Sequence, residues 1–268
     1  MTGTSLSQRG PSFLARLCLA GALAALLAGA AGCAAQQAAQ GPASPPPQEE
    51  ELPDPLEDLN RVVFQINEVL DTIVLRPLGE VYRALLPGPV RESVRNFLRN
   101  LSSPVVFFND VLQGRGDRAE ITLGRFIVNT TLGVGGLFDV AKDMGAPYHG
   151  EDFGQTLGVW GLKPGIYLVL PILGPSTTRD AIGRGVDLFM NPFTYLYAAG
   201  DVEYLSLAFG GLGAVDLRAR NIELVDQLKR DALDYYTLIR SIYHQLRESE
   251  IRNGNTQGGG PEKKIELE

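Results

Sequence analysis

Apolar residues recur every three or four positions along much of the chain, which is the spacing of one face of an α-helix. The longest such run extends from Leu56 to Ile73, and the Asp54–Pro55 pair before it is suited to begin a helix. Proline removes a backbone donor, so we expect Pro77 to end or kink this first helix. The pattern therefore predicts a helical body that begins near residue 54.

Further helices follow from the same spacing, over these ranges: 90–101, ended by Pro104; 104–114, ended by Gly114; 117–128, begun by Asp117; a helix begun by Ser176 or Thr178 and ended by Pro192; a short helix begun by Asp201; and a long helix from Leu217 to Leu246. No segment of the sequence shows sustained alternation of apolar and polar residues, and no strand–helix succession is visible. The sequence therefore predicts an all-α fold in a single domain.

The segment from residue 153 to residue 180 is rich in apolar residues and glycines. Its run from Ile166 to Gly174 is too short to cross a bilayer as a helix, which takes about 20 apolar residues. Pro171 makes the run a poor central strand. Trp160 and Tyr167 lie in the same segment. Two interpretations stay open: a buried core segment, or a membrane-contacting segment whose aromatic rings lie at the headgroup level.

The first residues have the pattern of a bacterial export signal. Arg9 and Arg16 precede an apolar run that ends in small residues at Cys33. The end of the run resembles a lipobox, whose cysteine becomes the lipid-modified first residue, although Ala30 stands where lipoboxes usually carry leucine. We predict a lipoprotein signal peptide over 1–32 and acylation at Cys33. An ordinary secretory signal is the alternative.

Composition divides the rest of the chain. Residues 33–53 are rich in Ala, Gln, Pro and Glu and are predicted to form a flexible tether. Residues 253–268 are predicted to form a disordered tail, which leaves 54–252 as the helical domain. Because Cys18 lies in the predicted signal, Cys33 is the one cysteine expected in the mature chain, and no disulfide is expected.

Charge disfavours some partners. The whole chain has a net charge of −7, and removal of the predicted signal with Arg9 and Arg16 leaves 22 basic against 31 acidic residues, a net charge of −9. This balance disfavours nucleic acid and gives no polybasic patch for a membrane surface. Ala34 follows the cysteine where an inner-membrane retention signal has Asp, which favours the outer membrane.

Motifs for catalysis and for cofactor binding are missing from the sequence. No serine lies in a G-x-S-x-G arrangement, and the stretch from Leu132 to Asp139 lacks the third glycine and the preceding strand of a dinucleotide loop. His149 has Glu151 and Asp152 nearby, but one histidine beside carboxylates is a weak indication of a metal or acid–base site. We predict no catalytic residue, no cofactor and no metal.

Several stretches of the chain resemble the MlaA/VacJ family of Gram-negative outer-membrane lipoproteins. The combination of D-P-L-E…N-R, F-G-Q-T-L-G and L-P…G-P-S…R-D is specific for that family, whereas no single motif would be. The stretches that carry the resemblance are Asp54–Asp71, Arg76–Gly114, Arg125–Ala141, Asp152–Gly183 and Asn191–Leu196.

The resemblance implies a ring of amphipathic helices embedded in one membrane leaflet, the inner leaflet of the outer membrane, around an amphipathic channel. Family members work with a trimeric porin and pass phospholipid to a soluble periplasmic lipid carrier. The net effect is removal of phospholipid misplaced in the outer leaflet, without ATP or a metal. Two other functions stay open: a purely structural partner of a porin, and a lipid hydrolase.

For the lipid path we nominate the turn between Gly133 and Phe138 as a mobile gate, with a set of aromatic and charged residues nearby. The candidates are Gly133, Gly135, Gly136, Phe138, Trp160, Tyr167, Arg179 and Asp180. The alternative interpretation is structural: Arg179 and Asp180 form an ion pair within the fold, and Trp160 belongs to the core.

Overall fold

The computed structural model describes residues 52–202 and 204–252. All of these residues belong to one compact unit of the chain. The predicted signal peptide over 1–32, the predicted acylation site Cys33, the predicted tether up to residue 51 and the predicted tail over 253–268 lie outside the described residues.

Helices make up most of the described unit, and one short hairpin lies among them. The elements are α2 (Glu57–Leu70), the π-helix η1 (Asp71–Leu75), α3 (Arg76–Leu85), α4 (Gly88–Leu112), α5 (Gly116–Thr131), α6 (Val140–Asp143), α7 (Phe153–Val159), β1 (Tyr167–Leu170), β2 (Gly174–Thr177), α8 (Thr178–Met190), α9 (Pro192–Ala199), α10 (Tyr204–Arg220), α11 (Ile222–Asp231) and α12 (Tyr235–Arg252). The prediction of an all-α fold is confirmed, with the hairpin as a small addition.

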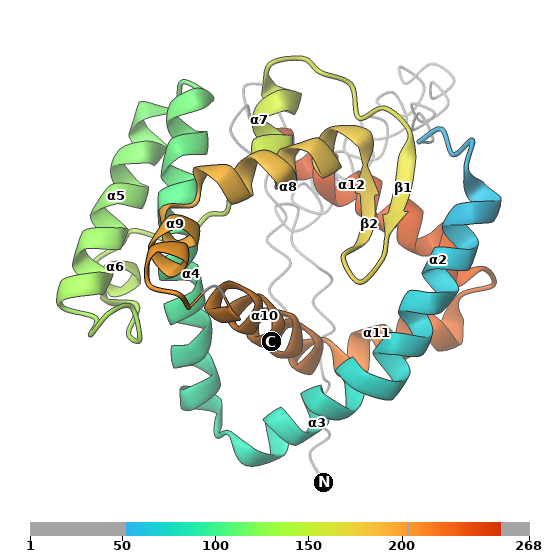
Figure 1. Cartoon of the computed structure of the whole chain (residues 1–268), viewed down its shortest axis with the longest axis horizontal. Helices are drawn as coiled ribbons and strands as arrows, with labels where there is room; N and C mark the ends of the chain where they lie inside the picture. Colours follow the sequence, from blue (N-terminus) through green and yellow to red (C-terminus); the bar gives the residue numbers. More distant parts are fainter. Residues whose placement is uncertain (1–51, 203, 253–268) are drawn as a thin grey trace, which may run out of the picture. The chain divides into compact units, whose positions relative to one another are not determined.

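In the view of Figure 1, the helices of this unit follow one another around a ring. The α2, η1 and α3 helices form one side, α4 pairs with α5, and α7 packs on α8 and on α12. The α10 helix packs on α3 and α4 and leads toward α11 and α12. The expected ring of helices is thus the arrangement of the described unit.

The predicted break at Pro104 is wrong, because α4 continues through this proline from Gly88 to Leu112. Proline removes one intrahelical hydrogen bond, here the one that the carbonyl oxygen of Asn100 would accept, and a helix that packs on its neighbours can tolerate this loss. The hydroxyls of Ser102 and Ser103 donate to the carbonyl oxygen of Arg99, at 2.8 and 3.1 Å, in the turn before the proline. The contact of α4 with α5 supports the continuous helix.

The predicted long helix over 217–246 is also wrong, because the chain ends one helix and begins another twice in that range. Asn221 separates α10 from α11, and its side-chain amide donates to the carbonyl oxygen of Leu217 at 2.8 Å. Asp234 precedes α12 and accepts from the backbone N–H of Thr237 at 3.2 Å. Asn and Asp side chains compete for backbone groups in this way, and a hydrophobic period does not register them.

The start of α2 differs from the prediction by a few residues. The helix begins at Glu57, and Asp54 does not cap it. Instead, Asp54 accepts a hydrogen bond from Asn60 at 2.7 Å and another from the hydroxyl of Tyr236 in α12. Pro77 lies in the first turn of α3, where no N–H is needed, and the distortion before it takes the form of η1.

The apolar run around Pro171 forms a hairpin. β1 and β2 pair antiparallel from Tyr167 opposite Thr177 to Leu170 opposite Gly174, and Pro171 lies in the connection, where it costs no ladder hydrogen bond. Each strand has only four residues, which is too short for the alternation of buried and exposed positions to stand out in the sequence. Thr177, between the two predicted caps, is the residue that caps α8.

Two asparagines of α2 form hydrogen bonds with the backbone N–H and C=O groups at the outer edge of this hairpin. Asn60 donates to the carbonyl oxygen of Tyr167 at 3.1 Å and accepts from the N–H of Val169 at 2.9 Å. Asn67, two turns later, donates to the carbonyl oxygen of Leu170 and accepts from the N–H of Ile172, at 2.9 and 2.8 Å. A short strand edge would otherwise leave these backbone groups unpaired, so α2 and the hairpin form one unit.

The buried residues of this unit are unusual in kind. A small apolar cluster contains Leu52, Tyr167, Val169 and Tyr236. Elsewhere in the described part, fully buried polar and charged side chains outnumber apolar ones, and many large apolar side chains are exposed. Soluble domains show the opposite distribution, because burial of apolar area is their main stabilising contribution.

The closest approach between α7 and α8 depends on a glycine. A Cβ atom at Gly183 would lie 2.3 Å from the backbone nitrogen of Gly154, whereas a Cβ atom at Gly185, on the same helix, would meet nothing within 4 Å. We predict that Gly183→Ala lowers the free energy of unfolding by about 1–3 kcal/mol, and that Gly185→Ala is neutral or raises it by up to about 1 kcal/mol. Thermal unfolding in detergent solution measures both. Equal midpoints for the two variants would contradict this packing.

Candidate functional site

A continuous stripe of exposed apolar side chains runs along α2, η1 and α3. Its residues recur three or four positions apart, so they share one face of the helical segment. The stripe consists of Leu59, Val62, Ile66, Val69, Leu70, Ile73, Val74, Leu78, Val81 and Leu85. Exposed apolar area of this extent marks a surface that contacts a lipid or protein partner.

The π-helix η1 keeps the two halves of this stripe in line. An apolar triplet recurs at a spacing of 19 residues: Leu59, Val62 and Ile66, then Leu78, Val81 and Leu85. In an uninterrupted α-helix, that spacing would turn the second triplet about 100° away from the first. A π turn takes up about one extra residue, and the remaining 18 or so complete about five turns. The position of η1 therefore aligns both triplets on one face.

Other apolar side chains are exposed at the hairpin and at the end of α8. Ile172 and Leu173 form the tip of the hairpin and are 77% and 64% exposed, and Phe189 is 76% exposed. Ile172 has a φ of 67°, a region that a β-branched residue rarely adopts. Strain of this kind is typical of functional positions, and here it holds an apolar side chain at an exposed tip.

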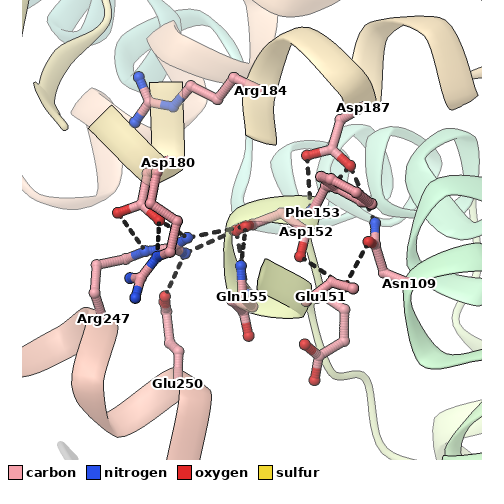
Figure 2. A network of polar contacts seen from close by, with 12 residues as sticks. Asn109, Glu151, Asp152, Phe153, Gln155, Asp180, Arg184, Asp187, Arg247 and Glu250 are labelled. Carbon is pink, nitrogen blue, oxygen red and sulfur yellow. Dashed lines mark hydrogen bonds and ion pairs between the residues drawn. The ribbon is translucent and has the colours of Figure 1, made fainter. Parts of the chain in front are cut away.

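Arg247 of α12 is the centre of a charged network, which Figure 2 shows. Its guanidinium donates to both carboxylate oxygens of Asp152, at 2.7 and 2.9 Å, and to Asp180 at 2.9 Å. Asp152 caps α7 and Asp180 lies in the first turn of α8, so one side chain joins three helices. Asp180 also accepts from the hydroxyls of Tyr243 and Thr177.

These contacts set the ionisation of the two carboxyls. Burial opposes ionisation of Asp180, but the hydrogen bonds and the charge of Arg247 outweigh it and lower the pKa of this carboxyl to about 2. The pKa of Asp152 is lowered for the same reasons. The pKa of the Arg247 guanidinium is raised, because both partners outweigh the effect of its burial. The network is therefore fully ionised at neutral pH.

A second chain of polar contacts continues from this network toward α4. Asp187 of α8 accepts from the side-chain amide of Asn109 at 3.0 Å and from the backbone N–H of Phe153 at 3.1 Å (Figure 2). The hydroxyl of Thr156 donates to Asn109 at 2.7 Å. Burial raises the pKa of Asp187, and the neutral donors offset only part of that effect. Burial likewise raises the pKa of Glu151, despite Gln113 and the nearby charge of Arg118.

The nominated glycine turn follows α5. Backbone hydrogen bonds close it, from Gly135 to Thr130 at 3.0 Å, from Gly136 to Asn129 at 2.8 Å and from Phe138 to the carbonyl oxygen of Gly133 at 3.0 Å. A Cβ atom at Gly136, whose φ is +93°, would lie 2.5 Å from the side chain of Asn100 in α4. The turn therefore packs against the middle of α4, and Phe138 is 57% exposed beside it.

The other nominated residues lie apart from that turn. Trp160 is 55% exposed, and its indole N–H donates to the carbonyl oxygen of Leu112 at 3.0 Å. Tyr167 is fully buried in the small apolar cluster. Arg179 and Asp180 are each 3% exposed and form an ion pair at 3.2 Å inside the charged network. The structure brings Arg179 and Asp180 together, and joins neither of them to the glycine turn by any hydrogen bond or ion pair within the described residues.

The histidine noted in the sequence belongs to a buried polar group. Nε2 of His149 lies 3.0 Å from Oδ2 of Asp110, which also accepts from the hydroxyl of Thr122 at 2.6 Å. In the part of the chain that the structure describes, no cluster of three or more His, Cys, Asp or Glu side chains is arranged to hold a metal ion. Over the same residues, no helix combines the length and the apolar character needed to cross a membrane.

Sequence reasoning found Asp180 but missed Arg247, its main partner. The two residues are 67 positions apart, and Arg247 and Asp152 are 95 positions apart. Both distances exceed what a local motif can indicate. Asp187 and Asn109 were missed for the same reason, since neither lies in a recognisable pattern.

Exposed apolar stripes around a buried, charged framework define a class of protein: an amphipathic helical body whose apolar faces require a lipid or protein partner. The sequence model of the MlaA lipoprotein family matches residues 52–250. This match, with the relatives described next, shows that the chain belongs to the MlaA lipoprotein family.

Three relatives and one solved structure illustrate the match. The chain is 34% identical over 218 residues to the intermembrane phospholipid transport system lipoprotein MlaA of Escherichia coli (strain K12), over 80% of this chain and 84% of the relative. It is 34% identical over 212 residues to the protein of that name in Haemophilus influenzae, over 77% and 82%. It is 37% identical over 203 residues to the uncharacterized protein RC0123 of Rickettsia conorii, over 75% and 79%. The structure described as "Structural basis for maintenance of bacterial outer membrane lipid asymmetry" is similar with a TM-score of 0.67 and 33% identity, over 74% of this chain and 98% of the other.

We predict that Arg247→Met lowers the free energy of unfolding by about 3 kcal/mol at pH 7, because it leaves two carboxylates buried without their main partner. The folded-state pKa of Asp180, about 2, is below its ordinary value of 3.8, so this carboxyl stabilises the fold above pH 4 and loses that effect as pH falls through 2. The difference between wild type and variant should therefore shrink from pH 4 to pH 2.

Thermal unfolding followed by circular dichroism in detergent solution, from pH 7 to pH 2, measures this difference. Arg252→Met is the matched control, since Arg252 lies on the same helix but is exposed, and among the described residues its ion pair is with Glu248 at 3.7 Å. The raised pKa of Glu151 acts in the opposite sense, but it is common to both proteins and cancels in the comparison. The charge of Arg247 also lowers the pKa of Asp187, so its loss raises that pKa further and adds to the difference at neutral pH. A pH-independent difference would contradict the assigned ionisation.

Proposed function

We propose that this protein removes phospholipids misplaced in the outer leaflet of the outer membrane and passes them to a soluble periplasmic carrier. The observation that carries this proposal is the distribution of side chains, with apolar stripes exposed and charges buried. A lipid with two chains of about 16 carbons carries roughly 30 methylenes, and passage of its tails through water would cost about 20–25 kcal/mol. An amphipathic ring shelters the tails and offers the headgroup a polar route.

The relatives support the same function. Two of them are named as intermembrane phospholipid transport system lipoproteins, and the similar structure concerns outer membrane lipid asymmetry. We extend those functions to this chain because the match covers most of its described unit. No enzymatic step is part of the proposal, which needs only binding and release of lipid.

The proposed location is the periplasmic side of the outer membrane, with the helical body in the inner leaflet. The exposed apolar stripe of α2 and α3 would lie among acyl chains, in the manner of an interfacial helix. Cys33 would carry the acyl anchor after removal of residues 1–32, residues 33–53 would form the tether, and 253–268 a free tail behind the domain over 54–252. The partners would be a trimeric porin and the periplasmic carrier.

The lipid path remains part of this proposal. The turn from Gly133 to Phe138 would act as the gate, because it borders α4 and carries an exposed aromatic side chain. Trp160 would contribute at the lipid surface, where an exposed indole is favoured. Arg179 and Asp180 would act from within, by holding the start of α8 in place.

Native mass spectrometry of the complex with its porin tests the function as a whole. The expected result is co-bound phospholipid in a gently solubilised preparation. A complex without any phospholipid would favour the purely structural alternative and overturn the proposal. Release of fatty acid or headgroup by the pure protein would favour a hydrolase.

The exposed stripe gives a direct prediction for membrane association. In a chain that carries Cys33→Ala, so that no acyl anchor contributes, Ile66→Asp together with Val81→Asp should weaken partition into phospholipid vesicles at least about tenfold, because each change removes an apolar side chain from lipid. Vesicle flotation measures the partition. Ile66→Leu together with Val81→Leu, which keeps both positions apolar, is the matched control. Unchanged flotation of the double variant would argue against contact between the stripe and lipid.

The predicted acylation site gives a second test. Cys33→Ala in the full chain should reduce the fraction of protein found in the outer membrane and sensitise cells to detergent, because an acyl anchor adds about 0.8 kcal/mol of membrane affinity for each buried methylene. Membrane fractionation and growth in the presence of detergent measure the two effects. Cys18→Ala, which alters the other cysteine, should change neither. Normal outer-membrane recovery of the Cys33 variant would refute the lipobox assignment.

A further inference from the structure

Three arginines lie one turn apart on a single face of α4. Arg91, Arg95 and Arg99 occupy positions i, i+4 and i+8, and each is partly buried. We call this set the arginine ladder. Like charges at a spacing of four residues repel one another on a helix, so the ladder is unfavourable by itself. It is also unexpected in a chain whose net charge is −7.

Few carboxylates within the described residues compensate the ladder. Asp216 of α10 lies 3.4 Å from Nε of Arg95, but it is shared with Arg220, at 3.0 Å, and with the hydroxyl of Tyr82, at 3.2 Å. Asp216 is thus shared by two guanidinium groups, of which one belongs to the ladder. Arg91 has no ion pair in the described part of the chain, and its Nε is buried without a hydrogen-bond partner.

Arg99 has no carboxylate partner among the described residues. Across residues 52–202 and 204–252 it forms no ion pair, and its guanidinium lies over the ring of Tyr148 at 4.5 Å. Burial lowers the pKa of Arg99, and the charges of Arg95 and Arg220 lower it further. The nearby Asp139 is already bound by Arg125 at 2.8 Å. The charge of Arg99 is thus available to a ligand.

The surroundings of Arg99 are polar. A small cavity of about 10 Å³ lies beside it, lined by Asn96, Asn100 and Arg125 among others, and Oδ1 of Asn100 is buried without a partner. That volume suits about one water molecule and is too small for a phosphate. An anion would therefore lie along the face of the ladder, and the cavity beneath it would hold a water molecule. Asn100 also contacts Gly136 of the proposed gate.

We propose that the arginine ladder binds the phosphate of a phospholipid and gives this chain a preference for anionic over zwitterionic headgroups. This inference rests on the proposed function, because it names the lipids that the protein carries. A phosphodiester supplies the negative charge that the ladder lacks, and guanidinium groups bind phosphate oxygens through paired N–H donors. The ammonium group of a zwitterionic headgroup would be repelled by the same arginines.

Competition between two lipids tests the preference. The full chain, purified in detergent, is incubated with equal amounts of phosphatidylglycerol and phosphatidylethanolamine that carry the same acyl chains, and native mass spectrometry counts the bound lipid. We expect several-fold more phosphatidylglycerol on the wild type. Arg99→Gln should weaken binding of phosphatidylglycerol about tenfold, and Arg99→Lys should weaken it less. Binding of phosphatidylethanolamine should weaken by a smaller factor, because its ammonium group already offsets part of the attraction between its phosphate and the arginines. Arg252→Gln removes an exposed charge and should change nothing.

Three readouts keep the test decisive. The thermal midpoint of Arg99→Gln should equal that of wild type or exceed it, since the change relieves repulsion between arginines. If the midpoint falls sharply, Arg91→Gln repeats the test at another arginine of the ladder. Inorganic phosphate at millimolar concentration should displace little lipid, and full displacement would show a site for free phosphate instead. Equal binding of both lipids by wild type and Arg99→Gln would overturn the preference and leave the proposed function standing, whereas absence of any bound phospholipid would overturn both.

Discussion

Arg247 neutralises two carboxylates that α7 and α8 bury, and the junction of these helices with α12 depends on this one guanidinium. In a soluble domain an apolar core would hold such helices together, and a buried ion pair would add little net stability. Here the apolar side chains are on the exposed faces, and the buried contacts are mostly charged and hydrogen-bonded. Helices in lipid associate in this way, because apolar faces gain nothing by leaving acyl chains.

The same constraint explains which parts of the fold the sequence predicted. The three-to-four spacing indicated α2, α5 and α8 correctly and found α4 as two separate helices, because each of these helices has one apolar face. It did not locate the ends of helices at Asn221 and Asp234, where side chains compete for backbone groups. It also placed an end at Pro104, where the loss of one hydrogen bond does not end α4, which packs along α5. Helix boundaries depend on such local bonds, which periodicity does not contain.

The candidate site was predictable in part. The apolar stripe is visible in the sequence, and so is the 19-residue recurrence of its triplet, but a pattern alone does not show that η1 aligns the two halves. The charged network could not be predicted from the sequence, since the partners of Arg247 are 67 and 95 residues away. The arginine ladder had a local signal, a repeat of four residues in α4. Its meaning depends on the single carboxylate of Asp216, which comes from a helix more than 100 residues later.

The exposed apolar stripe and the buried arginine ladder are two consequences of the same arrangement. A helical body that exposes apolar side chains to lipid must turn its polar side chains inward, and each inward charge then needs a partner, because an unpaired buried charge is costly. Most of the described charges meet this demand through protein partners, as Arg247 does with Asp152 and Asp180. The ladder does not, since its charges exceed the carboxylates around it. A protein that carries phospholipid has a negatively charged ligand available, and in our proposal the phosphate of that ligand compensates the excess of arginine charge on α4.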